Sequence, residues 1–162
     1  LQLVMPRTLS MHFIRLGILI ERANQTLRVL EANSKLQMLS DVSIDDYYHW
    51  VMLLRSVSSL EAYQEISNEM PSQERVLEFL LLHPAIPRSV RYCIEEIRNL
   101  LEMIGSENRR PSLKIIAKLL VKLQHDSIFD IMAIGQDTYI QLLQNEVSAL
   151  GESIQEGYFI IS

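Results

Sequence analysis

The sequence predicts an all-α protein, an antiparallel helical bundle of five or six helices with no sheet. Glycine and proline are scarce, with five of each in 162 residues, so few positions interrupt a helix. No window alternates apolar and polar residues as a half-buried strand would. Apolar residues instead recur at spacings of three and four, which is the period of a helix with one buried face.

The first helix is expected over residues 7–39, since no proline follows Pro6 in this stretch. The polar run SDVSIDD then interrupts the helical pattern. Ser43 fits an N-cap with Asp46 three residues later, so a second helix is expected over 44–68.

Two helices are expected in the middle of the chain. Pro71 begins a short, almost wholly apolar helix that runs to Leu82. Pro87 begins the next one, because its missing N–H costs nothing in a first turn, and Gly105 ends it. The buried stripe expected on this helix is Val90, Ile94, Ile97, Leu101 and Ile104.

The last part of the chain predicts helices over residues 112–124 and 127–155. Gly135 lies inside the second of these and indicates a kink or a close contact. The buried stripe expected on the first is Ile115, Ile116, Leu119, Leu120 and Leu123.

The composition favours one soluble domain over residues 1–162. Hydrophobic residues make up 48% of the chain and charged residues 22%, as in ordinary globular proteins. The net charge of -5 argues against binding to nucleic acid or to an anionic membrane, both of which need clustered Lys and Arg. The single cysteine, Cys93, cannot form an internal disulfide, and no apolar run reaches the roughly 20 residues that span a bilayer. We therefore expect a cytoplasmic protein, and because the chain starts at Leu1, the end of a longer polypeptide.

Three polar residues interrupt the apolar arc of the first helix. At about 100° per residue, Arg15, Arg22 and Thr26 fall within about 20° of one line along the helix. Apolar residues are expected on both sides of that line, namely Met11, Ile18 and Val29 on one side and Leu16, Leu19, Ala23, Leu27 and Leu30 on the other. Glu21, Gln25 and Arg28 fall on the opposite, polar face.

An arginine among aliphatic residues needs water or an acid, because an unpaired buried charge is costly. Acids on neighbouring helices could pair with Arg15 and Arg22 and fix the helix register. The two guanidinium groups could instead line a cleft and bind an anion bidentately. They could also extend to solvent along their aliphatic stems.

Three segments resemble, in order and spacing, the C-terminal half of the bacterial alpha-E family. They are HFIRLGILIERANQTLRVLE, DDYYHWVMLLRSVSSLEAY and IPRSVRYCIEEIRNLL. The family is an uncharacterised α-helical domain named for a glutamate-arginine motif, which Glu21 and Arg22 match. The flanking matches are Arg15, Thr26 and Arg28 in the first segment, Tyr48, His49, Trp50, Arg55, Ser56 and Tyr63 in the second, and Pro87, Arg88 and Ser89 in the third.

The chain departs from the family pattern next to Thr26. Gln25 and Leu27 stand where the family usually has asparagine and alanine. The resemblance implies a part in peptide or amide-bond metabolism, since members are commonly encoded beside, or fused with, ATP-grasp-like ligases and transglutaminase-like proteins. It also implies a second, N-terminal half of similar design.

The remaining polar clusters predict no catalytic centre and no cofactor. Asp45 and Asp46 lie one helical turn before His49, but two or three ligands do not make a metal site, and acids in a first turn favour the helix dipole. Cys93 is expected to be a buried thiol. The lysines at 114, 118 and 122 indicate a solvated face or a surface for an acidic partner.

Three functions remain open. The first is a non-catalytic accessory domain that works with an ATP-grasp-like partner. The second is a ligand-binding or catalytic subunit in which Arg15, Glu21, Arg22 and Arg88 bind a carboxylate or a phosphate. The third is a homo-oligomeric helical protein with an apolar surface that another copy or the N-terminal half covers.

Overall fold

The structure is a computed structural model that describes residues 7–39 and 46–159. Its longest helix occupies residues 7–39, as the sequence predicts. The described residues form eight α-helices, one short 3₁₀ helix and no strand. The helices are α1 Arg7–Leu39, α2 Asp46–Ser56, α3 Leu60–Ile66, α4 Gln73–Leu82, α5 Val90–Ile104, η1 Glu107–Arg109, α6 Arg110–His125, α7 Ile128–Ile134 and α8 Gln136–Tyr158. The prediction of an all-α fold is confirmed.

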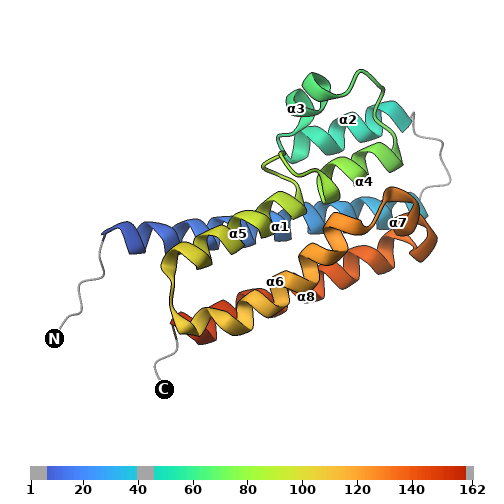
Figure 1. Cartoon of the computed structure of the whole chain (residues 1–162). Coiled ribbons are helices and arrows are strands. Elements are labelled where there is room, and N and C mark those ends of the chain that lie inside the picture. The colour runs from blue at the N-terminus through green and yellow to red at the C-terminus, as the bar shows by residue number, and fades with distance from the viewer. Residues whose placement is uncertain (1–6, 40–45, 160–162) are drawn as a thin grey trace.

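Four long helices, α1, α5, α6 and α8, form an antiparallel bundle (Figure 1). Helix α1 packs against α5 and α8, and α6 packs against the same two helices. The direction follows from paired side chains: Phe13 contacts Tyr158 at one end of α1, and Ser34 contacts Asp137 near the other. The core is an apolar cluster to which all four helices contribute.

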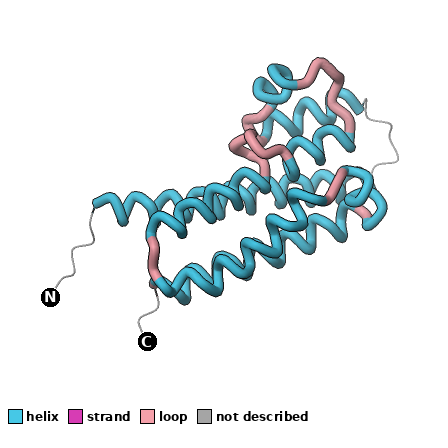
Figure 2. The backbone as a smooth tube through the Cα atoms, viewed as in Figure 1, coloured by secondary structure: helices cyan, strands magenta, loops and turns pink. Residues whose placement is uncertain are grey.

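The three helices α2, α3 and α4 form a smaller group over one end of the bundle, beside α7 (Figure 1). Most of the loops lie around this group (Figure 2). It places the connection between α4 and α5, which carries Pro87 and Arg88, against the middle of α1. This junction positions the candidate site.

The single helix expected over 44–68 is two helices in the structure. Helix α2 ends at Ser56, and Ser58, in the turn that follows, has a positive φ of 54°. The amide of Ser58 donates to Arg55, and the amide of Ser59 donates to Leu54, which satisfies the last carbonyl groups of α2. The left-handed residue that follows a helix is usually glycine. Because serine stands at this position, the sequence did not indicate that the helix ends here.

The structure also divides the helix expected over 127–155. Gly135, at φ 98°, separates α7 from α8. A positive φ is strained for residues with a side chain, which explains the glycine. The N-cap expected at Ser43 lies outside the described residues.

Most of the predicted buried stripes are buried. Leu16, Leu19, Ala23, Leu27 and Leu30 of α1 are in the core, as are the stripe residues of α5 and α6 except the half-buried Ile104 and Ile115. The prediction is wrong for Met11 and Ile18, which are 63% and 52% exposed. Helix α5 covers only one side of the line through Arg15 and Arg22, and no described element covers the other side.

Candidate functional site

Arg15, Arg22 and Thr26 form a polar seam along α1, and each of them contacts α5 or the loop before it. Arg15 Nη2 lies 3.3 Å from Glu96 Oε2, and Arg22 Nη1 donates to the Pro87 carbonyl at 3.4 Å. Thr26 Oγ1 donates to the Arg88 carbonyl at 2.8 Å. The three side chains lie along one line of α1, and their partners all belong to the segment of residues 87–96, which runs antiparallel to α1.

The seam becomes more buried towards the C-terminal end of α1. Arg15 is exposed, Arg22 is half-buried and Thr26 is fully buried. A buried hydroxyl needs a hydrogen-bond partner, and the Arg88 carbonyl is the partner of Thr26. Thr26 therefore fixes the loop that carries Arg88 against α1.

A surface hollow of about 450 Å³ lies where this loop meets α1. We call it the arginine hollow; its lining residues are Ile14, Gly17, Ile18, Glu21, Arg22, Gln25 and Arg88. Its volume lies within the range of small-ligand sites. Arg88 Nη1 donates to Gln25 Oε1 at 3.2 Å, so the Gln25 amide orients one of the two arginines.

The arginine hollow carries positive charge that the protein does not balance. In the described part of the chain, no carboxylate forms an ion pair with Arg22 or Arg88. Each guanidinium group has five N–H donors, and the structure gives Arg22 and Arg88 one side-chain hydrogen bond each. Most of these donors remain available to a ligand.

Glu21 has a different partner from Arg22. Its Oε1 atom accepts from Arg28 Nη2 at 2.5 Å, and both side chains are more than half exposed. An exposed pair of this kind contributes little to stability. The glutamate of the motif thus faces solvent at the rim of the hollow, while the arginine faces the loop before α5.

The loop before α5 presents its carbonyl groups inward. The Pro87 carbonyl accepts from both Arg22 and the Cys93 thiol, and Ser89 is fully buried at the N-cap position of α5. Burial raises the pKa of Cys93 to about 11, although Arg22 and Arg88 oppose this shift. Cys93 is therefore a structural thiol beneath the site.

None of the residues of the second motif lines the arginine hollow. Trp50 and Tyr63 are buried, His49 is half-buried, and Tyr48 and Arg55 are exposed. Trp50 and Tyr63 pack in the core that α2, α3 and α4 share with the bundle. The structure does not bring this motif to the glutamate-arginine pair.

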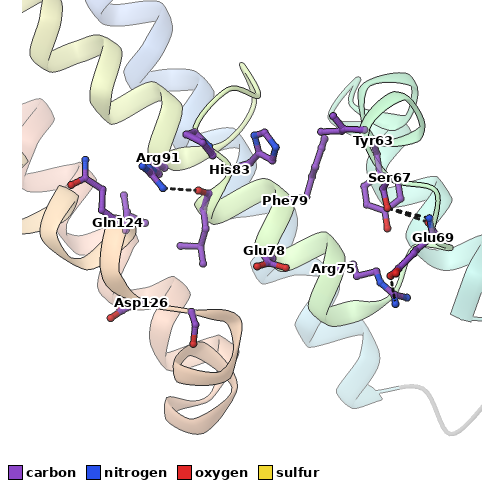
Figure 3. A pocket seen from close by; sticks show the side chains of 15 residues that line it. Tyr63, Ser67, Glu69, Arg75, Glu78, Phe79, His83, Arg91, Gln124 and Asp126 are labelled. Atoms are coloured by element: carbon purple, nitrogen blue, oxygen red, sulfur yellow. Dashed lines mark hydrogen bonds and ion pairs between the residues drawn. The ribbon is translucent and has the colours of Figure 1, made fainter.

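A larger cavity of about 650 Å³ lies between α3, α4, α5 and the end of α6 (Figure 3). Its charges are largely balanced inside the protein. Arg75 pairs with Glu69, as Figure 3 shows, and Arg91 pairs with Glu95 at 3.0 Å. Asp126 pairs with Lys122 at 3.0 Å.

The neutral groups of the larger cavity offer few contacts to a ligand. Burial, with a further contribution from Arg91, lowers the pKa of His83, so its ring is neutral at pH 7. The buried Tyr63 hydroxyl lacks a hydrogen-bond partner within the described segments, and the ring of Phe79 packs edge-on against Tyr63. This cavity is larger than the arginine hollow but has weaker chemistry for recognition.

No group of three metal-ligating side chains occurs among the residues that the structure covers. Asp45 and the side chain of Asp46 lie outside them. Lys114 and Lys118 are exposed, and Lys122 lies 4.6 Å above the ring centre of Tyr139. None of the helices in this part of the chain combines the length and the apolar composition that a membrane span requires.

Arg22 and Arg88 were candidates from the sequence, whereas Ile14, Gly17 and Ile18, which also line the arginine hollow, were not. Residues 14, 17, 18, 21 and 25 lie on one face of a helix, so a helical wheel could have grouped them. The sequence does not show which side of α1 the other helices leave uncovered, and this decides which face lines the hollow.

The fold and the hollow together define an all-α domain in which a glutamate-arginine pair on a long helix lines a surface site. A family model described as "a predicted alpha-helical domain with a conserved ER motif" matches residues 1–159. The chain therefore belongs to the Alpha-E family. A search of curated proteins and a search of solved structures each found no match.

The chain contains two glutamate-arginine pairs, Glu21–Arg22 and Glu74–Arg75. The second is in α4, where Arg75 pairs with Glu69 and also donates to the Met70 carbonyl at 3.3 Å. Its guanidinium group is thus largely used within the protein. Of the two pairs, Glu21–Arg22 has the arginine with the more available donors.

Proposed function

We propose that this domain binds an anionic group, a carboxylate or a phosphate, in the arginine hollow. One observation carries the proposal: Arg22 and Arg88, from separate segments, line the same hollow without a described carboxylate partner. Guanidinium groups bind carboxylates and phosphates through paired hydrogen bonds. An anion would supply the charge that the protein does not.

The geometry around the two arginines supports this proposal. The bond from Thr26 holds the backbone of Arg88, and Gln25 holds its side chain. Arg22 is held by the Pro87 carbonyl of the same loop. Residues that are positioned before a ligand arrives lose less entropy on binding, which favours affinity.

Thermal unfolding in sodium acetate or sodium phosphate, against sodium chloride at equal ionic strength, tests the proposal. An anion that binds the folded state raises the unfolding midpoint. We expect the rise for the wild-type protein and its loss in Arg22→Ala and in Arg88→Ala. Arg22→Lys should retain part of it, because lysine keeps the charge but not the paired donors.

Arg15→Ala is the matched control. Arg15 is on the same helix and the same seam, but it pairs with Glu96 and does not line the hollow. It should retain the full anion-dependent rise. Equal rises in all variants, or none in the wild type, would refute the proposal.

A second candidate function is that of an accessory domain for an ATP-grasp-like partner, as the family resemblance implies. The uncovered face of α1 favours it, since Met11, Ile14 and Ile18 are 63%, 63% and 52% exposed. Clustered exposed aliphatic residues are typical of interaction surfaces. In this function the arginine hollow would take an acidic group of the partner.

Mixing the purified domain with an ATP-grasp-like protein from its own source tests this second function. Size-exclusion chromatography should show a complex that Ile18→Glu abolishes and that Val121→Glu, on the far helix α6, does not. A domain that always elutes alone contradicts it. A mass that instead doubles with protein concentration would favour the homo-oligomer.

A further inference from the structure

Gly17 is in the middle of α1, at a position where nothing inside the protein requires a glycine. A Cβ atom built there meets no atom within 4 Å, and the residue has no positive φ. By contrast, a Cβ on Gly157 would lie 3.0 Å from the Asn108 carbonyl oxygen, and Gly105 and Gly135 have positive φ. These features explain the three glycines within the protein. A Cβ on Gly151, in α8, would lie at an ordinary contact distance of 3.8 Å from Ile20, and Gly17 has no such neighbour at all.

A glycine inside a helix lowers stability relative to alanine, since it loses more backbone entropy on folding. Gly17 lines the arginine hollow between Ile14 and Glu21. A missing side chain there leaves the helix backbone open to whatever enters the hollow. A ligand that packs against Gly17 would explain why the helix keeps a glycine that lowers its stability.

The residues that line the hollow indicate which chemical groups a ligand would carry. Two guanidinium groups, from Arg22 and Arg88, match one carboxylate. Glu21 lines the hollow at its rim, and its carboxylate disfavours a dianionic phosphate. Its Oε1 atom accepts from Arg28, and its Oε2 atom, which has no hydrogen-bond partner among the described residues, can accept from an ammonium group. Ile14 and Ile18 give the lining apolar side chains, and Gly17 adds a position without a side chain; we call these three residues the apolar floor.

We propose that the ligand of the arginine hollow is an α-amino acid with an aliphatic side chain. Its carboxylate binds Arg22 and Arg88, its ammonium group binds Glu21, and its side chain packs on Gly17, Ile14 and Ile18. This inference rests on the proposed function and narrows it. It explains why cationic, anionic and apolar groups share one hollow of about 450 Å³.

Titration calorimetry with L-leucine, glycine, N-acetyl-L-leucine and sodium acetate tests each part of the inference. Leucine should bind about tenfold more tightly than glycine, because burying roughly two methylene groups is worth about that factor. It should also bind more tightly than N-acetyl-leucine, which lacks the ammonium group. Glu21→Gln should remove this second preference, while acetate should bind at least as tightly as before, because a negative charge next to the anion is lost.

Gly17→Leu tests the apolar floor, because the new side chain occupies the space that the ligand needs. The leucine-to-glycine affinity ratio should fall towards one, while acetate still binds. Ala32→Leu is the matched control: Ala32 is exposed on the same helix, about 22 Å further along it, and does not line the hollow. Circular dichroism checks that both variants keep their helical content.

The outcomes separate the two proposals. Acetate that binds through Arg22, with leucine no tighter than glycine or acetate, overturns the amino-acid ligand and leaves the anion site standing. A wild-type ratio that Gly17→Leu does not change also overturns it. If none of the four compounds binds, the amino-acid ligand is overturned; the anion site also fails if sodium phosphate does not raise the unfolding midpoint.

Discussion

At the scale of single residues, the site depends on Thr26, whose hydroxyl joins α1 to the loop that carries Arg88. Its Oγ1 donates to the Arg88 carbonyl at 2.8 Å, and the residue is fully buried. A carbonyl group that folding removes from water, and that then has no hydrogen-bond donor, lowers the stability of the folded protein. The geometry of the arginine hollow and the stability of the protein are therefore linked at this residue.

Thr26→Val should lower the free energy of unfolding by about 1–3 kcal/mol, since the shape is kept but the carbonyl loses its partner. Urea unfolding followed by circular dichroism measures it. Thr138→Val, at an exposed position on α8, should change it by less than about 0.5 kcal/mol. Equal effects of both variants would mean that the hydrogen bond contributes nothing.

Cys93 should be unreactive in the folded protein. Burial raises its pKa to about 11, so at pH 8 only about one thiol in a thousand would be the reactive thiolate. We expect a thiol reagent such as DTNB to label it slowly at pH 8 and promptly in urea. Rapid labelling of the native protein would show that the bundle opens beside α5.

At the scale of helices, the glycines of this chain have opposite roles. Gly105 ends α5 in the left-handed conformation, with φ 70° and ψ 12°. Gly17 has ordinary helical φ and open space around it. The same substitution should therefore have opposite signs at the two positions.

Gly105→Ala should lower the free energy of unfolding by about 1 kcal/mol, because alanine is strained at positive φ. Gly17→Ala should raise it by about 0.5–1 kcal/mol through helix propensity alone. Chemical denaturation of the two variants measures both changes. A loss of stability in Gly17→Ala would mean that the glycine has an internal role, and it would remove the first step of the amino-acid inference.

The helices of the bundle could be predicted because their apolar spacing is regular. The bounds of α1 match the expected range, and the glycine after α5 ends it as expected. The break after α2 could not be predicted, since it depends on a serine in the left-handed region that no local pattern marks.

The polar seam was predictable in part. The 20° register of Arg15, Arg22 and Thr26 follows from helix geometry, and all three contact α5 or the loop before it. Their partners could not be deduced, since Glu96 is 81 residues from Arg15 and two of the three acceptors are backbone carbonyls. Backbone acceptors leave no signal in a sequence.

At the scale of the whole molecule, the bundle and the smaller group of α2, α3 and α4 have separable tasks. The bundle provides the long face of α1, and the smaller group precedes the loop that brings Arg88 to that face (Figure 1). The same face carries exposed aliphatic residues beside the two arginines. Charge and apolar surface thus occur together on one side of the molecule.

The central claim is that Arg22 and Arg88 act together as one anion site, and the arginine side-chain Nε–Hε resonances test it most directly. In a titration with acetate at constant ionic strength, the signals of Arg22 and Arg88 should shift together and fit one dissociation constant. Those of Arg15 and Arg28, which already pair with Glu96 and Glu21, should hardly move. Shifts spread evenly over all arginines, or absent from Arg22 and Arg88, would contradict the claim.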